Sequence, residues 1–529
     1  MQNSLRQRKP IVSERAEMKN TERRSSDLLP SGVYNVQFPR TVYYISSVIL
    51  VGLLLILVGV FELRRLTLDH RLMLEKSLWR PDSLTNVTNG KKTCDSRPVV
   101  WVRGKNLESG YLRHVFSVFE QLGYRVGDGT DDWSVLWSHE YPFAELSHEM
   151  THLKPYQRVN HFPGSGYITN KVSLSTGSNS EHVPKAFKLP QQKEEFLLET
   201  QMHPHKLWVQ KSNHHRGIQV KSVDELSLDQ NGTFVQEFLT NPLLIDGKKF
   251  DIGVYTVMTS LNPLRVYTYS GDVLLRFCSK VYEDPVDPQD VDSYVVGDDY
   301  TPTWQMPSLK DFYVNGSFSM KESLSLYLRM LKKDYKKMWL EIENAIANVY
   351  FKKERDMINA AAKYKASRGT NFFELVRFDF VVDEDLNVYL MEANMSPNLS
   401  SAHFSQNKIL YEQVIYNVLS VIGLGNTATK EVKEHHQSIV SDKNIVVYPD
   451  ECFSDRCAKC TSNVKCKLCQ RCLSHTQKRI LKDAFVEHLN RGDLTRIIPA
   501  KNKSALSSAN ELLWLWFEGK CQLDPHFCT

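Results

Sequence analysis

The sequence predicts an α+β protein, and three observations support this fold class. A hairpin pattern occupies residues 373–394, where two apolar, β-branched runs flank a short polar turn. A strand that alternates polar and apolar residues follows a turn at Asp246-Gly247. A strand, a helix and a second strand lie between residues 98 and 137, which is typical of a small α/β domain.

The hairpin carries the first candidate site. With its turn centred on residues 385 and 386, Asp379 lies opposite Glu392, and directly opposed residues have Cβ atoms about 5 Å apart. Asn394 shares the face of Glu392 because it follows two residues later. Two carboxylates and an amide oxygen on one face suit a hard cation such as Mg²⁺, which accompanies phosphates. The alternative is a hairpin whose acidic residues only face solvent.

The alternating strand carries the second candidate site. Lys249, Asp251 and Gly253 share one face, and the apolar residues between them share the other. A lysine beside an aspartate suits a nucleotide, because the ammonium group binds phosphate and the carboxylate binds a hydroxyl or holds the lysine. Taken alone, the pair is better explained as an ordinary ion pair on an edge strand.

The N-terminal domain, residues 97–200, is predicted from its local patterns. Residues 98–102 form an apolar strand, residues 111–122 repeat with helical period up to Gly123, and residues 133–137 form the next strand.

Composition is that of an ordinary globular protein of two or three domains. The 529 residues are 42% hydrophobic and 24% charged, and the net charge of +5 gives no global field that favours nucleic acid as a partner. A local basic excess is either a solvated helix face or a dock for an acidic peptide. It comprises Lys332, Lys333, Lys336, Lys337, Lys352, Lys353 and Arg355.

Residues 42–61 carry no charge and are long enough to cross a bilayer, so we expect a transmembrane helix at 42–63 and a single-pass membrane protein. Residues 1–41 are expected to be a basic disordered tail, and residues 64–96 a stalk. Basic residues on both sides leave the orientation open. Six N-x-Ser/Thr sequons follow the predicted span, and they favour a location of this following part of the chain in the lumen.

Cysteines are concentrated at the C-terminal end, where a linker at 426–445 precedes a Cys-rich module at 446–529. Eight of the ten cysteines follow residue 450. In the cytosol such a cluster suggests zinc, and in an oxidising compartment it suggests four disulfides. The short spacing between the C-x2-C pairs disfavours the usual zinc ribbon.

Several ordered motifs resemble the tubulin-tyrosine ligase-like family of ATP-grasp ligases over residues 97–425. The set is specific, although each motif alone is weak. The motifs are Asn160-His161-Phe162-Pro163-Gly164 with Lys171, Trp208-Val209-Gln210-Lys211, Arg216-Gly217-Ile218, Val235-Gln236-Glu237-Phe238, residues 241–247, Lys249-Phe250-Asp251, Pro263-Leu264-Arg265-Val266-Tyr267, Leu275-Arg276-Phe277 and the hairpin.

The resemblance implies an ATP-grasp core at 201–425 and a role for each candidate residue. Mg²⁺ would be held by Asp379, Glu392 and Asn394, and the phosphates of ATP would be faced by Lys171, Lys211 and Lys249. Gln236 and Glu237 would lie on the adenine-binding hinge, and Asp251 near the ribose. Arg276 would meet a substrate carboxylate, and Arg216 would close over the phosphates.

One departure from the family pattern affects the expected activity. Gly253 stands where the family usually has an arginine, and the loss of a cation near a developing phosphoryl charge costs several kcal/mol. Arg377 stands where a glycine is common, and is a candidate for a substitute charge. Ser212 replaces a usual proline, a change we expect to be tolerated.

The expected function is therefore ATP-dependent ligation of glutamate to glutamate side chains of tubulin tails through an acylphosphate, as in tubulin polyglutamylases. Tubulin or microtubules, glutamate and a membrane are the expected partners. The alternatives are a membrane-anchored, catalytically impaired relative, and a lumenal ligase with another substrate.

Overall fold

The computed structural model describes residues 95, 97–177, 181–212, 218–364, 370–425, 440–461, 463–499 and 508–528, together with Gly52 and Gly59. The chain divides into two compact units, residues 1–93 and 94–529, and every element below belongs to the second unit. The predicted tail, the stalk except residue 95, and most of the linker lie outside the described residues.

The expectation of a single-pass membrane protein is corrected here. In the part of the chain that the structure describes, no helix combines the length and the apolar character that a bilayer crossing requires. The segment predicted to cross, residues 42–63, itself lies outside that part except for its two glycines.

A parallel sheet with strand order β2-β1-β3-β4 opens the second unit. Its first strand and its first long helix lie where the sequence predicts them. The apolar face of this helix packs against the sheet. The helix ends before Gly123, which has a φ of 76°. The strands are β1 (Val99–Arg103), β2 (Arg125–Gly127), β3 (Val135–Ser138) and β4 (Arg158–Val159); the helices are α2 (Arg113–Gln121), α3 (Pro142–Glu145) and α4 (Ser147–Thr151).

A small antiparallel sheet with order β5-β8-β6-β7 follows. Phe187 and Trp208 of this sheet pack on Phe196 of the helix α7, and the three form an apolar core of their own. The strands are β5 (Ala186–Leu189), β6 (Trp208–Ser212), β7 (Val220–Lys221) and β8 (Thr233–Glu237); the helices are α5 (Gly166–Thr169), α6 (Lys171–Thr176) and α7 (Lys193–Met202).

The largest sheet is built around β9, which is buried along its whole length. One edge of β9 pairs with β13, and the other edge pairs first with β11 and then with β10. The strands are β9 (Phe250–Leu261), β10 (Leu264–Tyr269), β11 (Leu274–Phe277), β12 (Thr301–Pro302), β13 (Glu374–Val382), β14 (Val388–Met395) and β15 (Leu494–Ile498). The predicted turn before β9 is confirmed, since Asp246 and Gly247 both have positive φ.

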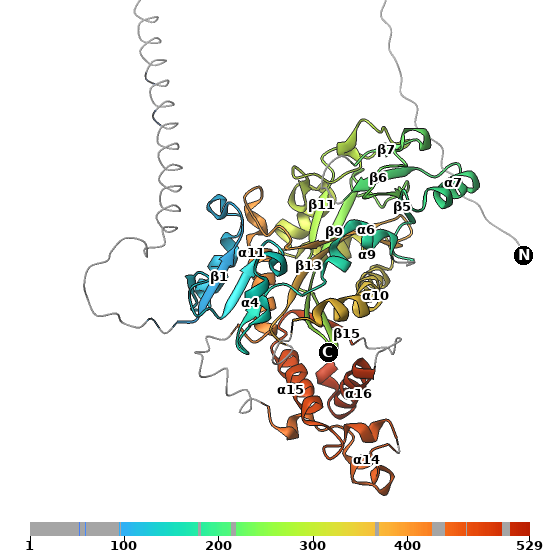
Figure 1. Ribbon diagram of the computed structural model, residues 1–529. Coiled ribbons are helices and arrows are strands. Elements are labelled where there is room, and N and C mark those ends of the chain that lie inside the picture. Colours follow the sequence, from blue (N-terminus) through green and yellow to red (C-terminus); the bar gives the residue numbers. More distant parts are fainter. Residues whose placement is uncertain are drawn as a thin grey trace, which may run out of the picture. The chain divides into compact units, whose positions relative to one another are not determined.

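The long helix α10 (Tyr335–Ala361) lies along this sheet (Figure 1), and its Tyr350 ring packs on Phe378 of β13. A bridge between Val159 and Phe372 connects the first sheet to the start of β13. The remaining helices before the tail are α8 (Pro307–Lys310), α9 (Met320–Met330) and α11 (Lys408–Val421). Together the sheets and helices form a mixed α/β fold.

The C-terminal segment contributes directly to the largest sheet, because β15 pairs with β10. Glu487 accepts a fork of hydrogen bonds from the buried Arg265 of β10, at 2.8 and 3.0 Å. The helices here are α14 (Pro449–Phe453), α15 (His475–Leu489) and α16 (Ser508–Leu523). Sequence patterns did not predict this pairing.

The eight cysteines after residue 450 form four disulfides in the structure rather than a metal site. The pairs are Cys452–Cys469, Cys457–Cys466, Cys460–Cys472 and Cys521–Cys528. Within the described segments, no group of three His, Cys, Asp or Glu side chains is placed to hold a metal ion.

Candidate active site

The hairpin β13–β14 brings Asp379 opposite Glu392, as the sequence predicts, but through an irregular register. Near the turn, Phe380 pairs with Leu390, and the register then shifts by one residue so that Asp379 pairs with Glu392. A bulge of this kind re-aims the side chains that follow it. It places Glu392 and Asn394 on the face of Asp379.

Asn394 lies between the two carboxylates. Its Nδ2 atom donates to Asp379 Oδ2 at 2.9 Å and to Glu392 Oε1 at 3.0 Å. The three side chains therefore converge on one point, and turning the amide would present its oxygen there instead. Two carboxylates and one amide oxygen fit Mg²⁺, which takes few protein ligands and completes its shell with water and phosphate oxygens.

Three lysines surround this point. Lys171, at the start of α6, contacts Glu392 at 2.7 Å, and Lys211 of β6 donates to Gln236 Oε1 at 2.7 Å. Lys249 lies over the ring of Phe238 at 4.7 Å. The three come from separate segments, so it is the fold that gathers them.

Burial shifts the pKa values at the site. It lowers the pKa of Lys211 to about 8, where Glu392 opposes the shift and Lys171 and Lys249 add to it. Burial likewise lowers the pKa of Lys249 to about 8. Burial alone would raise the pKa of Glu392, but the charge of Lys171 and hydrogen bonds from Lys171 and Asn394 lower it to about 2.

The two hinge candidates lie side by side at the end of β8 with different side-chain partners. Gln236 is fully buried and holds Lys211, so its side chain orients a lysine. The carboxylate of Glu237 pairs with Lys206 at 3.0 Å. Both side chains are therefore engaged with lysines, and the role of this segment as an adenine-binding hinge stays a prediction.

Asp251 and Arg276 face each other across β9 and β11. Arg276 donates to both oxygens of Asp251, at 2.9 and 2.7 Å, and also to Asp379 Oδ2 at 3.1 Å. Arg377 donates to both oxygens of Asp379, at 2.7 and 2.9 Å. Two arginines and two aspartates therefore form a row of contacts with alternating charge. This row lies beside the point where Asp379, Glu392 and Asn394 converge.

Two further findings concern individual residues. Arg216 lies outside the described residues, so its predicted role stays a prediction. His161, in a motif that carried the family resemblance, is buried and contacts Glu374 of β13 at 2.8 Å, while the Phe162 backbone N–H donates to the same carboxylate at 2.7 Å. This motif fixes the segment before Lys171 to β13.

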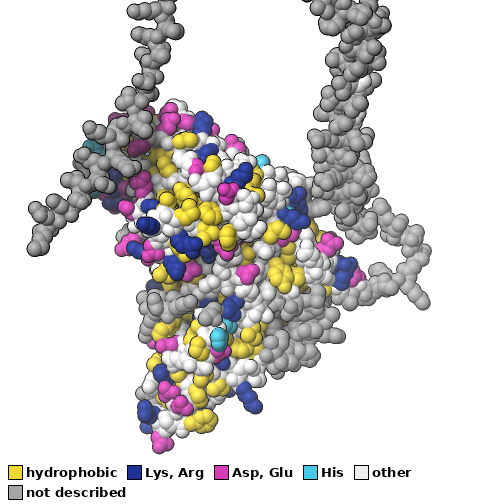
Figure 2. All heavy atoms as spheres, turned by 180° about the vertical axis from the view of Figure 1, so that it is seen from behind, with side chains coloured by type: hydrophobic (Ala, Val, Ile, Leu, Met, Phe, Trp, Pro, Cys, Tyr) yellow, Lys and Arg dark blue, Asp and Glu magenta, His cyan; other side chains and the backbone are white. Residues whose placement is uncertain are grey.

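The basic excess along residues 332–355 is divided by the fold. Lys353 is buried and donates to the carbonyl oxygen of Ser173 at 3.2 Å, and Lys333 donates to the carbonyl oxygen of Glu384. Lys336 and Lys352 are exposed. Figure 2 shows basic side chains interspersed with acidic and apolar ones on the face opposite to Figure 1, without one large basic field on that face.

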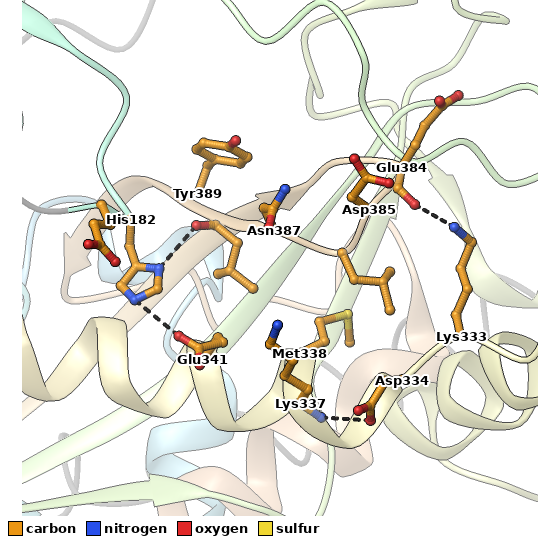
Figure 3. A pocket seen from close by; sticks show the side chains of 13 residues that line it. His182, Lys333, Asp334, Lys337, Met338, Glu341, Glu384, Asp385, Asn387 and Tyr389 are labelled. Carbon is orange, nitrogen blue, oxygen red and sulfur yellow. Dashed lines mark hydrogen bonds and ion pairs between the residues drawn. The ribbon is translucent and has the colours of Figure 1, made fainter.

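A cavity of about 820 Å³ lies at the turn end of the hairpin, against the start of α10 (Figure 3). None of the predicted site residues that the structure describes lines it. His182 points to Glu341 on α10, and Lys333 points to the turn. Its lining residues carry both charge signs and pair with one another, which does not indicate a phosphate site.

A mixed α/β fold that gathers two carboxylates, an amide and several cations around one point is typical of enzymes that act on nucleotides. The chain belongs to the tubulin-tyrosine ligase family, since the profile described as "Tubulin-tyrosine ligase family" matches residues 148–431.

Curated relatives agree with this family. The chain is 42% identical over 485 residues to "Probable tubulin polyglutamylase ttll-15" of Caenorhabditis elegans, covering 88% of this chain and 94% of that protein. It is 27% identical to "Tubulin polyglutamylase TTLL6" of Mus musculus over 63% of this chain and 42% of that protein. For "Tubulin polyglutamylase TTLL5" of Mus musculus the identity is 29%, over 54% of this chain and 23% of that protein. The chain thus spans nearly all of the nematode relative but less than half of the two mouse proteins.

Proposed function

We propose that this protein is an ATP- and Mg²⁺-dependent ligase that joins glutamate to glutamate side chains of tubulin tails. The observation that carries the proposal is the convergence of Asp379, Glu392 and Asn394, with Lys171 in contact with Glu392. The names of the relatives supply the substrate, tubulin, and the amino acid, glutamate.

The proposed reaction has two steps. A γ-carboxylate of the tubulin tail attacks the γ-phosphate of ATP, which releases ADP and gives an acylphosphate. The amine of free glutamate then attacks the acyl carbon, which releases phosphate and forms the amide. Mg²⁺ supplies neutralisation of phosphoryl charge in the first step.

The chain's own residues position the reactants in this scheme. Lys171, Lys211 and Lys249 bind the phosphates as charged ammonium groups, and Gln236 keeps Lys211 directed at them. Arg276, which is partly exposed beside Asp251, binds a substrate carboxylate in this scheme. The exposed lysines of α10 are a candidate contact for the acidic tail.

An assay with purified protein tests the proposal. Incubation with MgATP, labelled glutamate and tubulin is expected to transfer label to tubulin, with release of one ADP per glutamate. Labelled tyrosine or glycine in place of glutamate serves as the control for the amino acid. Absence of transfer in the presence of bound nucleotide would favour a catalytically impaired relative.

The disulfides favour a second candidate, the same ligation on a substrate in an oxidising compartment, because disulfides persist there and are rare in the cytosol. Maleimide labelling of the protein from its native source distinguishes the two. Labelling of the C-terminal cysteines without prior reduction supports tubulin as the substrate. Protection of these cysteines from maleimide until they are reduced supports the second candidate.

A pH dependence follows from the two buried lysines. Both are charged below their folded pKa of about 8 and lose the proton as the pH rises through that value, so nucleotide affinity should fall from pH 7 towards pH 9.5. The expected slope is about tenfold per pH unit for each lysine that binding must reprotonate. Titration calorimetry across this range measures it. Lys211→Arg should reduce the slope, and a constant affinity would contradict the assignment of both lysines.

A further inference from the structure

Gly253 lies inside β9, where its backbone does not require glycine. Its φ is outside the left-handed region, so the reason for glycine is space. A Cβ atom at this position would lie 2.9 Å from Arg377 Cδ, 3.3 Å from Arg377 Nε and 3.2 Å from Asp379 Oδ1. The side chain of Arg377 therefore fills the space above Gly253, as expected where a strand glycine permits a close approach.

Arg377 reaches this position from the neighbouring strand. In the register of β13 with β9, Arg377 pairs with Tyr255 and Asp379 pairs with Gly253. The arginine side chain extends diagonally across Gly253 and ends in a fork on both carboxylate oxygens of Asp379. It is 6% exposed, and although burial opposes its charge, Asp379 raises the pKa of Arg377 well above its ordinary value.

The fork determines how the Asp379 carboxylate is oriented. Oδ2 accepts from Arg377, Arg276 and Asn394, whereas Oδ1 accepts one hydrogen bond, from Arg377 Nε. Arg377 therefore fixes the plane of the Asp379 carboxylate and keeps Oδ2 turned towards Asn394, at the point where the candidate Mg²⁺ ligands converge.

Charge balance gives Arg377 a second effect. Asp251, Asp379 and Glu392 are matched by Arg276, Arg377 and Lys171 through direct contacts. Removal of Arg377 leaves one buried negative charge uncompensated beside the point where phosphoryl charge develops.

We propose that Arg377, seated on Gly253, is a positioning residue for the ligation: it holds the Asp379 carboxylate in the orientation for Mg²⁺ and keeps one positive charge beside the transferred phosphoryl group. The proposal rests on the proposed function. In this proposal Gly253 leaves the space that the side chain of Arg377 occupies, and Arg377 supplies the cation that the family usually has at position 253.

Guanidinium rescue tests the proposal. Arg377→Gly places two glycines side by side and should lower kcat for ligation about 10²- to 10³-fold, the size of one lost transition-state donor. Guanidinium chloride at millimolar concentration should raise the kcat of this variant at least about tenfold. Urea, which is neutral and of nearly the same shape, should not, and sodium chloride controls for ionic strength.

A second readout does not depend on turnover. Without nucleotide, guanidinium chloride at these concentrations should raise the thermal midpoint of Arg377→Gly relative to sodium chloride, and should leave that of the wild type unchanged. Equal rescue by urea would overturn the proposal, because filling of space would then suffice. Wild-type kcat in Arg377→Gly would also overturn it.

The reciprocal variant Gly253→Arg/Arg377→Gly moves the guanidinium from β13 to β9 and should be more active than Arg377→Gly alone. If Arg377→Gly does not fold, Arg377→Lys keeps the charge without the fork and should show reduced kcat with little change in the KM for ATP; unchanged kcat would overturn the proposal. An inactive wild type would refute the proposed function, whereas an active wild type with an equally active Arg377→Gly would refute only the role of Arg377.

Discussion

Replacing Glu392 by glutamine is expected to lower ligation at least about 10³-fold while the protein stays folded. The substitution removes one of the two carboxylates that converge with Asn394, and with it much of the charge that would hold Mg²⁺ against the phosphates. A glutamine oxygen can still accept from Lys171 and Asn394, so the thermal midpoint should change little. Steady-state release of ADP and transfer of labelled glutamate measure the effect.

Glu384→Gln is a matched control for this variant, because Glu384 is exposed at the turn of the same hairpin. It is not one of the charged residues that surround Asp379 and Glu392. It should retain wild-type kcat. Turnover by Glu392→Gln equal to that of Glu384→Gln would contradict the assignment of the metal site.

Replacing Glu487 by alanine is expected to destabilise the protein by about 3–5 kcal/mol, the cost of leaving a buried charge without its partner. Arg265 is 2% exposed and donates twice to Glu487, which also accepts from Thr259 at 2.8 Å and Tyr267 at 3.2 Å. Burial opposes the charge of Arg265, and Glu487 more than offsets it and raises the pKa of Arg265. Thermal and urea unfolding measure the loss.

A double variant separates the unpaired charge from the lost packing. Arg265→Met/Glu487→Leu removes both charges and should recover much of the stability that Glu487→Ala loses, because a buried ion pair is often replaceable by apolar residues. As a control, Glu511→Ala on α16 changes a carboxylate that is only half-buried and should have a small effect. If Glu487→Ala unfolds like the wild type, the C-terminal segment does not stabilise the large sheet as described.

The sequence was informative where a pattern is local. Alternation fixed which faces of β9 and of the hairpin carry charge, and the turn residues at Asp246-Gly247 matched the observed turn. The opposition of Asp379 and Glu392 was also predicted, although the pairing near the turn differs by one residue from the assumed register and the bulge restores it. A bulge cannot be read from alternation alone, because it is a shift between strands.

Contacts between distant segments were not predictable in this way. The fork from Arg377 to Asp379 depends on the space left by Gly253 on another strand, and the fork from Arg265 to Glu487 spans 222 residues. Lys353 looked like part of a basic surface because the sequence does not show that α6 ends against it. Each of these features requires the packing of elements that the chain brings together only on folding.

The central claim is that Asp379, Glu392 and Asn394 hold a magnesium nucleotide. Calorimetric titration of the purified protein with a non-hydrolysable ATP analogue, with Mg²⁺ and then with EDTA, tests it most directly. Binding in the millimolar range or tighter that weakens without Mg²⁺, and that Glu392→Gln makes insensitive to Mg²⁺, is the predicted result. No binding by the folded wild type, or the same affinity with and without Mg²⁺, would contradict the claim.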